Sequence, residues 1–209
     1  MKIKVCGMRD IENISDVLTV EPNFMGFIFY PKSPRFTSNI PQTQFPAKTK
    51  KVGVFVNEEI EKIFEKVERF QLDFVQLHGS ESPEYCSELF NSNLFSKNNQ
   101  VHIIKAFSVN ENFNFNATTP YEVYCKYFLF DTKGTNFGGN GVKFNWEILK
   151  NYKGNTPFLL SGGITKNDVE AINKINHPKF KGVDINSGFE IKPGLKNVKE
   201  IREFKNNLK

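Results

Sequence analysis

The chain has few of the residues that build disulfide frameworks and metal sites. Its 209 residues include three cysteines and three histidines. Cys6, Cys86 and Cys125 are far apart and none belongs to a C-x-x-C pair, which argues against a disulfide scaffold and a redox motif. The histidines are equally scattered and lack the H-E-x-x-H spacing that gathers metal ligands on one helix face. We therefore predict that the protein binds no metal.

Long apolar runs and a targeting pattern are also missing. No stretch of the sequence is long and apolar enough to cross a bilayer. The strand-like start Ile3-Lys4-Val5-Cys6 lacks the charged head, apolar middle and small-residue cleavage site of a signal peptide. We expect a soluble protein without a membrane partner, in the cytoplasm or another reducing compartment.

No charge of one sign dominates. Twenty-eight Lys and Arg stand against 23 Asp and Glu, for a net charge of +5 and an isoelectric point near 9.0. The basic residues are spread along the chain with acidic residues between them, and no basic stripe is interleaved with aromatic residues. This balance modestly favours small anionic ligands, and we expect no nucleic-acid partner.

The chain does contain a regular alternation of strand and helix patterns. Eight apolar runs have the length and composition of buried parallel strands, at residues 2–5, 24–29, 51–56, 74–77, 102–106, 127–130, 157–160 and 181–185. Because eight such units with helices between them close into a barrel, the sequence predicts a (β/α)8 TIM barrel. The length and the 22 Phe suit one core, so we expect a single catalytic domain over residues 1–209.

Helix limits follow from capping residues and amphipathic spacing. The predicted helices are 58–70 capped by Asn57, one that opens at Ser82-Pro83, 168–175 capped by Asn167, and a closing helix over 195–204. In residues 31–50 and 108–126, Pro, Asn and Thr dilute the pattern. The second and fifth helices should therefore be short or irregular.

Two predicted strands end in small residues. The seventh leads into Ser161-Gly162-Gly163-Ile164, and the eighth closes in Asn186-Ser187-Gly188. Backbone N–H groups approach a phosphate closely where no Cβ intervenes, and (β/α)8 barrels commonly bind phosphate on the loops after the last two strands. The pair of endings predicts a bipartite phosphate site, although any one glycine also fits an ordinary tight turn.

Reactive side chains follow two other strands. Cys6 comes directly after the first strand and Asp131 after the sixth, and barrel enzymes place their chemistry at the carboxyl ends of strands. A thiol and a carboxyl group there can divide a proton transfer between them. Taken singly, Cys6 fits a small buried apolar residue and Asp131 a turn residue equally well.

Short motifs that follow one another in a fixed order resemble the phosphoribosylanthranilate isomerase family over nearly the whole chain. They are Val5-Cys6-Gly7-Met8, Ser33-Pro34-Arg35-Phe36, Val52-Gly53-Val54-Phe55-Val56-Asn57, Val75-Gln76-Leu77-His78-Gly79, Phe130-Asp131-Thr132, Gly138-Gly139-Asn140-Gly141, Phe144-Asn145-Trp146, Ser161-Gly162-Gly163-Ile164, Val183-Asp184-Ile185-Asn186-Ser187-Gly188-Phe189-Glu190 and Lys192-Pro193-Gly194. A lone Gly-Gly pair would say little, whereas this ordered set is specific to the family.

The resemblance implies an aldose–ketose type isomerase of tryptophan biosynthesis. Such an enzyme converts N-(5-phosphoribosyl)anthranilate into 1-(o-carboxyphenylamino)-1-deoxyribulose 5-phosphate by an Amadori rearrangement. By this similarity Asp131 is the general acid that protonates the ring oxygen, and Cys6 is the base that removes the C2 proton. The substrate nitrogen is its own electron sink, so the resemblance implies neither a metal nor an organic cofactor.

The resemblance also assigns the binding residues. Arg35, which alone would be read as a surface arginine, is expected to bind the anthranilate carboxylate through its guanidinium group. The phosphate is assigned to Gly162 and Gly163 after the seventh strand and to Ser187 and Gly188 after the eighth. The loop 138–141 is expected to cover the site, or else to be only a long mobile connection. His78 is given no catalytic role because Cys6 is available as the base.

Three asparagines depart from the family pattern without removing a proposed catalytic group. Asn140 stands where threonine is usual, Asn145 where aspartate is usual and Asn186 where serine is common. Asn145 can still cap a helix as aspartate would. Asn140 and Asn186 bear on loop closure and phosphate binding.

Other functions remain as alternatives. Indole-glycerol-phosphate synthase would use a lysine at a strand end, where Lys105 is a candidate, and the histidine-pathway sugar isomerase would have an aspartate in place of Cys6. A noncatalytic basic barrel could bind nucleic acid or a phosphorylated regulator, but it would need a clustered basic face. As partners we expect a small phosphosugar substrate and, at most, a second copy of the chain, in a monomer or homodimer.

Overall fold

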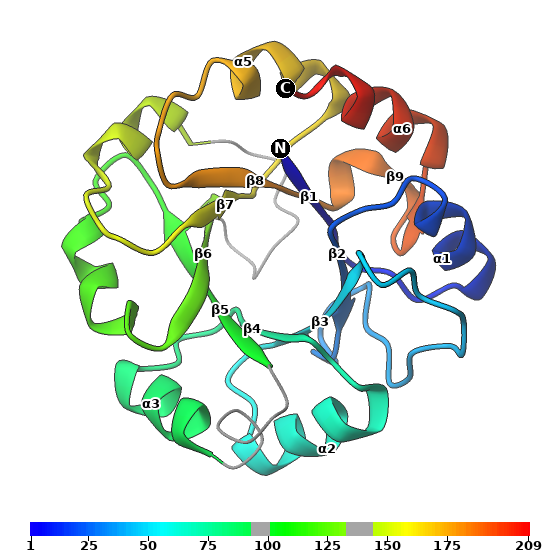
Figure 1. Cartoon of the computed structure of the whole chain (residues 1–209), viewed down its shortest axis with the longest axis horizontal. Coiled ribbons are helices and arrows are strands. Elements are labelled where there is room, and N and C mark those ends of the chain that lie inside the picture. Colours follow the sequence, from blue (N-terminus) through cyan, green and yellow to red (C-terminus); the bar gives the residue numbers. More distant parts are fainter. Residues whose placement is uncertain (93–100, 133–143) are drawn as a thin grey trace.

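Eight parallel strands form a closed barrel in the computed structural model, which describes residues 1–92, 101–132 and 144–209. Each strand pairs with the next one along the chain, and β8 returns to pair with β1. The strands are β1 (Lys2–Val5), β2 (Phe24–Ile28), β3 (Lys50–Phe55), β4 (Phe74–Leu77), β5 (His102–Val109), β6 (Cys125–Thr132), β7 (Phe158–Leu160) and β8 (Phe180–Ile185). In Figure 1 they make an inner ring with the helices outside it. The predicted barrel is confirmed.

Helices and two further short strands complete the described structure. The α-helices are α1 (Ile11–Leu18), α2 (Ile60–Phe70), α3 (Pro83–Asn91), α5 (Val169–Asn173) and α6 (Val198–Asn207). The 3-10 helices are η1 (Phe115–Tyr121), η2 (Trp146–Asn151), η3 (Lys166–Asp168) and η4 (Ser187–Phe189). After β8, β9 (Glu190–Lys192) and β10 (Leu195–Lys196) form a small antiparallel pair. No helix within the described ranges is long and apolar enough to cross a membrane.

The second predicted helix is absent, and the fifth is irregular as predicted. No helix lies between β2 and β3, where every residue is described. After β5 the chain forms the 3-10 helix η1, which contains Pro120. Proline has no backbone N–H to donate, so this segment cannot extend into a regular α-helix.

Two predicted caps are wrong, Asn57 because of a tertiary contact and Asn167 because a local capping box starts the helix earlier. The helix predicted from residue 58 begins at Ile60. Asn57 instead has a left-handed backbone, with φ of 49°, and its side-chain oxygen accepts from the Ser80 N–H at 2.7 Å. Asn167 lies inside η3, and the Asp168 carboxylate accepts from the Thr165 N–H at 2.7 Å.

The helix limits nearer the C-terminus also shift. The helix predicted over 168–175 is split into η3 and α5 and ends at Asn173. The closing helix begins at Val198 rather than at residue 195, because β10 takes up the two residues Leu195 and Lys196. The prediction at Ser82 is confirmed, since its hydroxyl accepts from the Tyr85 N–H.

Alternate residues of each strand point into the barrel or outward toward the helices. The lower interior is apolar and consists of Phe24, Val52, Phe74, Ile104, Ala106, Leu129 and Leu159. Buried polar residues, among them Lys4, Gln76, Asp131 and Asp184, occupy the interior nearer the carboxyl ends of the strands. The apolar layer closes one end of the barrel and leaves polar chemistry at the other.

Gly182 allows β8 to lie against β1 and provides a test of barrel closure. A Cβ at this position would lie 1.9 Å from the Lys2 carbonyl oxygen, so the backbone itself would have to move. Gly182→Ala should destabilise the protein by roughly 2–3 kcal/mol, measured by denaturant unfolding. Gly53→Ala is the matched control, because its Cβ would meet only the side-chain ends of Leu72 and Phe55, which can shift. Equal losses in the two variants would contradict this account of closure.

Candidate active site

A cavity of about 460 Å³ opens at the carboxyl ends of the barrel strands. This is the end at which barrel enzymes carry their active sites. All seven residues predicted as catalytic or binding groups line it: Cys6, Arg35, Asp131, Gly162, Gly163, Ser187 and Gly188. The structure thus brings together residues from the first, second, sixth, seventh and eighth strand ends.

Cys6 is buried at the end of β1. Its N–H donates to the Ile185 carbonyl at 2.9 Å, which fixes the start of the loop after β1 against β8. Burial raises the pKa of the Cys6 thiol, with the Lys4 ammonium opposing this rise and the Asp184 carboxylate adding to it. The thiol form is therefore favoured in the free protein.

Asp131 is buried at the end of β6 and contacts a histidine. Its Oδ2 lies 3.1 Å from His78 Nε2, and His78 Nδ1 lies 3.1 Å from Gln76 Nε2. With Gln76 donating to Nδ1, the neutral ring of His78 carries its proton on Nε2 and donates to Asp131. This chain of contacts aligns the carboxylate over the cavity and gives His78 a direct part in the site.

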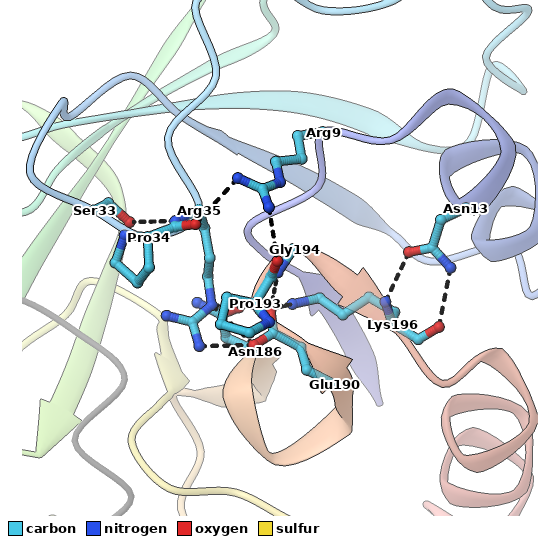
Figure 2. Close-up of polar contacts among 10 residues, drawn as sticks. All are labelled: Arg9, Asn13, Ser33, Pro34, Arg35, Asn186, Glu190, Pro193, Gly194 and Lys196. Atoms are coloured by element: carbon cyan, nitrogen blue, oxygen red, sulfur yellow. Dashed lines mark hydrogen bonds and ion pairs between the residues drawn. The ribbon is translucent and has the colours of Figure 1, made fainter.

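Arg35 is held by Glu190 in a bidentate ion pair (Figure 2). Arg35 Nε donates to Oε1 and Oε2 of Glu190 at 2.9 and 3.0 Å, and Nη2 donates to Oε2 at 2.7 Å. Within the described part of the chain, Nη1 has no hydrogen-bond partner. One edge of the guanidinium is therefore occupied, and its Nη1 end remains for a ligand in the cavity.

Glu190 also binds the small strand pair that follows β8. It accepts from Lys196 Nζ at 2.6 Å and from the Gly194 N–H at 3.0 Å. Burial acts to raise the pKa of Glu190, but the bonds from Arg35, Lys196 and Gly194 outweigh it and hold the pKa below its usual range. The carboxylate stays charged and ties the loop after β2 to the segment after β8.

Further bonds fix the same corner of the barrel (Figure 2). Lys196 Nζ donates to the Asn186 side chain at 2.7 Å, while the Asn13 amide pairs with the backbone of Lys196. Arg9 donates to the carbonyls of Pro34 and Pro193. The loops after β1, β2 and β8 therefore form one connected support for Arg35.

The two predicted phosphate loops touch each other. Gly162 and Gly163 both have positive φ, of 94° and 65°. A Cβ on Gly188 would lie 2.1 Å from the Ile164 carbonyl oxygen, so glycine lets the loop after β8 pack against the loop after β7. The two sequence motifs thus meet on one side of the cavity.

Lys105 does not serve the cavity. Its ammonium is buried on the outer side of β5, where it donates to Glu81 at 3.0 Å and to the carbonyls of Gly79 and Ala106. It is absent from the residues that line the cavity. A lysine so placed cannot act on a substrate in the barrel mouth, which removes the feature that favoured indole-glycerol-phosphate synthase.

Sequence reasoning missed the partners of the predicted groups: Lys4 beside Cys6, His78 beside Asp131, and Glu190 beside Arg35. His78 was visible as a polar residue at a strand end. Glu190 had no local signal, because its contact with Arg35 joins segments far apart in the chain. Lys4 lies two residues before Cys6, but its pairing with Asp184 across the barrel seam was not visible in the sequence. The covering loop predicted at 138–141, with Asn140, lies outside the described residues. Asn145 caps η2 as expected, accepting from the Glu147 N–H.

Among the described residues, no group of three or more His, Cys, Asp or Glu is arranged to hold a metal ion. Asp131 and Cys6, the predicted acid and base, differ in their neighbours: Asp131 contacts a histidine, and Cys6 lies near a lysine–aspartate pair. These surroundings suit two different roles in proton transfer.

Comparison with known proteins points to one family. The family model described as N-(5'phosphoribosyl)anthranilate (PRA) isomerase matches residues 3–207. The N-(5'-phosphoribosyl)anthranilate isomerase of Parabacteroides distasonis is 47% identical over 98% of this chain and 91% of its own length. That of Phocaeicola vulgatus is 43% identical over 100% of this chain and 98% of its own.

Solved structures show the same relationship. The phosphoribosyl anthranilate isomerase of Thermotoga maritima superposes with a TM-score of 0.82 and 31% identity, covering 99% of this chain and 98% of its own. A phosphoribosyl anthranilate isomerase in complex with reduced 1-(o-carboxyphenylamino)-1-deoxyribulose 5-phosphate gives a TM-score of 0.79 and 29% identity, covering 99% of this chain and 97% of its own. With a family match across almost the whole chain and relatives above 40% identity, the chain belongs to the N-(5'-phosphoribosyl)anthranilate isomerase family.

Proposed function

We propose that this chain performs the Amadori rearrangement of N-(5'-phosphoribosyl)anthranilate with Cys6 as base and Asp131 as acid. The observation that carries the proposal is that a thiol and a histidine-bound carboxylate line one cavity, together with an arginine and two glycine-containing loops. The thiol suits the reactive C2 and the protein carboxyl group suits the ring oxygen. The arginine suits the substrate carboxylate, and the two loops suit its phosphate.

The proton transfers follow from this placement. Asp131, carrying a proton, donates it to the furanose ring oxygen, and the C1–O bond breaks as the nitrogen lone pair forms an iminium. The positive nitrogen acidifies the C2 proton, which the Cys6 thiolate removes to leave an enolamine. Tautomerisation of the enolamine gives the ketone product. His78, hydrogen-bonded to Asp131, is positioned to exchange a proton with it between turnovers.

Arg35 and the glycine loops orient the two ends of the substrate. The free Nη1 end of Arg35 suits the anthranilate carboxylate, while Glu190 prevents the guanidinium from rotating away. Gly162, Gly163, Ser187 and Gly188 lie on two adjoining loops and are proposed to bind the phosphate. Holding both ends places the reacting sugar between Cys6 and Asp131.

The setting that fits this chemistry is the cytoplasm, with residues 1–209 acting as one catalytic domain. The Cys6 thiolate can act as a base only if Cys6 is not in a disulfide, and all three cysteines are free in this structure. The proposed function is compatible with a monomer and with a homodimer. One solved relative is named as monomers generated from the dimeric phosphoribosylanthranilate isomerase of Thermotoga maritima.

Substitution of the proposed acid and base tests the assignment. Cys6→Ser and Asp131→Asn should each lower kcat by about 10²- to 10⁴-fold while changing product affinity only a few-fold. The substrate can be generated in situ and its consumption followed by anthranilate fluorescence. Cys86→Ser is the matched control, because Cys86 is a buried thiol on α3 outside the cavity. A folded wild-type protein without activity would reject the proposed function.

The raised pKa of Cys6 predicts the pH dependence. The thiolate fraction rises about tenfold per pH unit below the pKa, so the rate at which a small alkylating reagent modifies Cys6 should climb along the same limb. The limb should extend into the alkaline range, because burial places the pKa above the usual value for a thiol. A plateau reached well below the ordinary thiol pKa would contradict this, as would an unchanged limb in Cys6→Ser.

Glu190→Gln tests the support of Arg35. Loss of the charged partner frees the guanidinium to turn, so KM should rise by about tenfold with a smaller change in kcat. Glu170→Gln is the control, because Glu170 forms an exposed pair with Lys174 on the outer surface. If Glu190→Gln instead lowered kcat with KM unchanged, Arg35 would have a role in the chemical step rather than in binding.

A further inference from the structure

Lys4 is a buried cation directly beneath the proposed base. It is 0% exposed, and it lies two residues before Cys6, so both side chains point into the barrel. Its ammonium donates to Asp184 Oδ1 at 2.9 Å, across the β1–β8 pair in which Lys4 and Asp184 are register partners. No step of the mechanism above uses this charge.

The Lys4 ammonium and the Cys6 sulfur share the space above Gly26. The point where a Cβ of Gly26 would stand is 2.8 Å from Cys6 Sγ and 3.1 Å from Lys4 Nζ. A side chain at position 26 would collide with both atoms. Because this residue is glycine, the sulfur and the ammonium lie close together beside β2. Proximity to an ammonium group favours a thiolate over a thiol.

The other charged groups around Cys6 are already paired. Lys196 from β10 is bound to Glu190 and Asn186. Asp131 from β6 contacts His78, which follows β4, and Arg35 is bound to Glu190. Asp184 from β8 opposes thiolate formation but is itself neutralised by Lys4.

We propose that Lys4 is a positioning residue for the base, whose ammonium turns from Asp184 toward Cys6 and stabilises the thiolate. The inference rests on the proposed role of Cys6. When the thiolate takes the C2 proton and becomes a neutral thiol, the ammonium is again fully paired with Asp184. Lys4 thereby supplies the charge balance for each turnover without touching the substrate.

The test is a titration of Cys6 in the absence of substrate. The thiolate is followed by its ultraviolet absorbance against pH in wild type and in Lys4→Met, each corrected by subtracting the spectrum of its Cys6→Ser counterpart. At a given pH below the pKa, Lys4→Met should reduce the thiolate population at least about tenfold. An unchanged titration in folded Lys4→Met overturns the proposal.

Lys105→Met is the matched control, because Lys105 is an equally buried lysine paired with a carboxylate, but on the outer side of the barrel. It should leave the Cys6 titration where it is in wild type. If it shifts the titration as much as Lys4→Met does, the effect is a general response of the fold and the proposal fails. Circular dichroism of every variant verifies folding.

A second variant covers the case in which Lys4→Met does not fold. Asp184→Asn removes the competing carboxylate, so the thiolate population of Cys6 should increase several-fold; no increase overturns the proposal. Because neither titration uses substrate, the two proposals can fail separately. If the chain has no isomerase activity but Lys4→Met shifts the Cys6 titration, only the proposed function is rejected. If the chain is an active isomerase but Lys4→Met leaves the Cys6 titration unchanged, only this inference is rejected.

Discussion

The need to pair every charge buried in the barrel mouth shapes the whole catalytic end. Lys4 is paired with Asp184, Arg35 with Glu190, and Asp131 with His78. An unpaired charge buried this deeply would lower the free energy of unfolding by several kcal/mol. Removal of one partner would therefore leave the other as an unpaired buried charge. The pairs therefore do more than add stability. They hold each reactive group in one orientation before substrate arrives.

These pairs differ in kind, which separates binding from chemistry. Glu190 anchors a binding arginine through fixed bidentate geometry and keeps its own charge through a lowered pKa. Cys6 lies by contrast in surroundings that raise its pKa, so the base is strong but sparsely ionised. A neighbouring lysine that compensates part of this burial is what the chemistry requires. The apolar lower barrel keeps water from the inner side of these groups.

Much of the fold could be predicted from local patterns. Strand runs and the bounds of β1 and β4 follow from apolar composition, and the absence of a second helix and the irregular fifth helix follow from proline and asparagine. The predictions that failed concern two helix caps, Asn57 and Asn167, although asparagine is a common capping residue. At Asn57 a contact with the loop after β4 outweighed a preference worth about 1 kcal/mol, and at Asn167 the local capping box of Thr165 and Asp168 starts the helix instead.

The sequence by itself determined the alternation of strands and helices, the strand ends that carry Cys6 and Asp131, and the ordered motifs of the isomerase family. Those features are local, because side-chain period and glycine placement are set along the chain. Only the tertiary structure decided which groups meet: Glu190 with Arg35, Lys4 with Asp184, and Lys105 with Glu81 on the outer side of β5. The reason is that barrel closure sets β8 beside β1, and a contact between residues about 180 positions apart leaves no local pattern in the sequence.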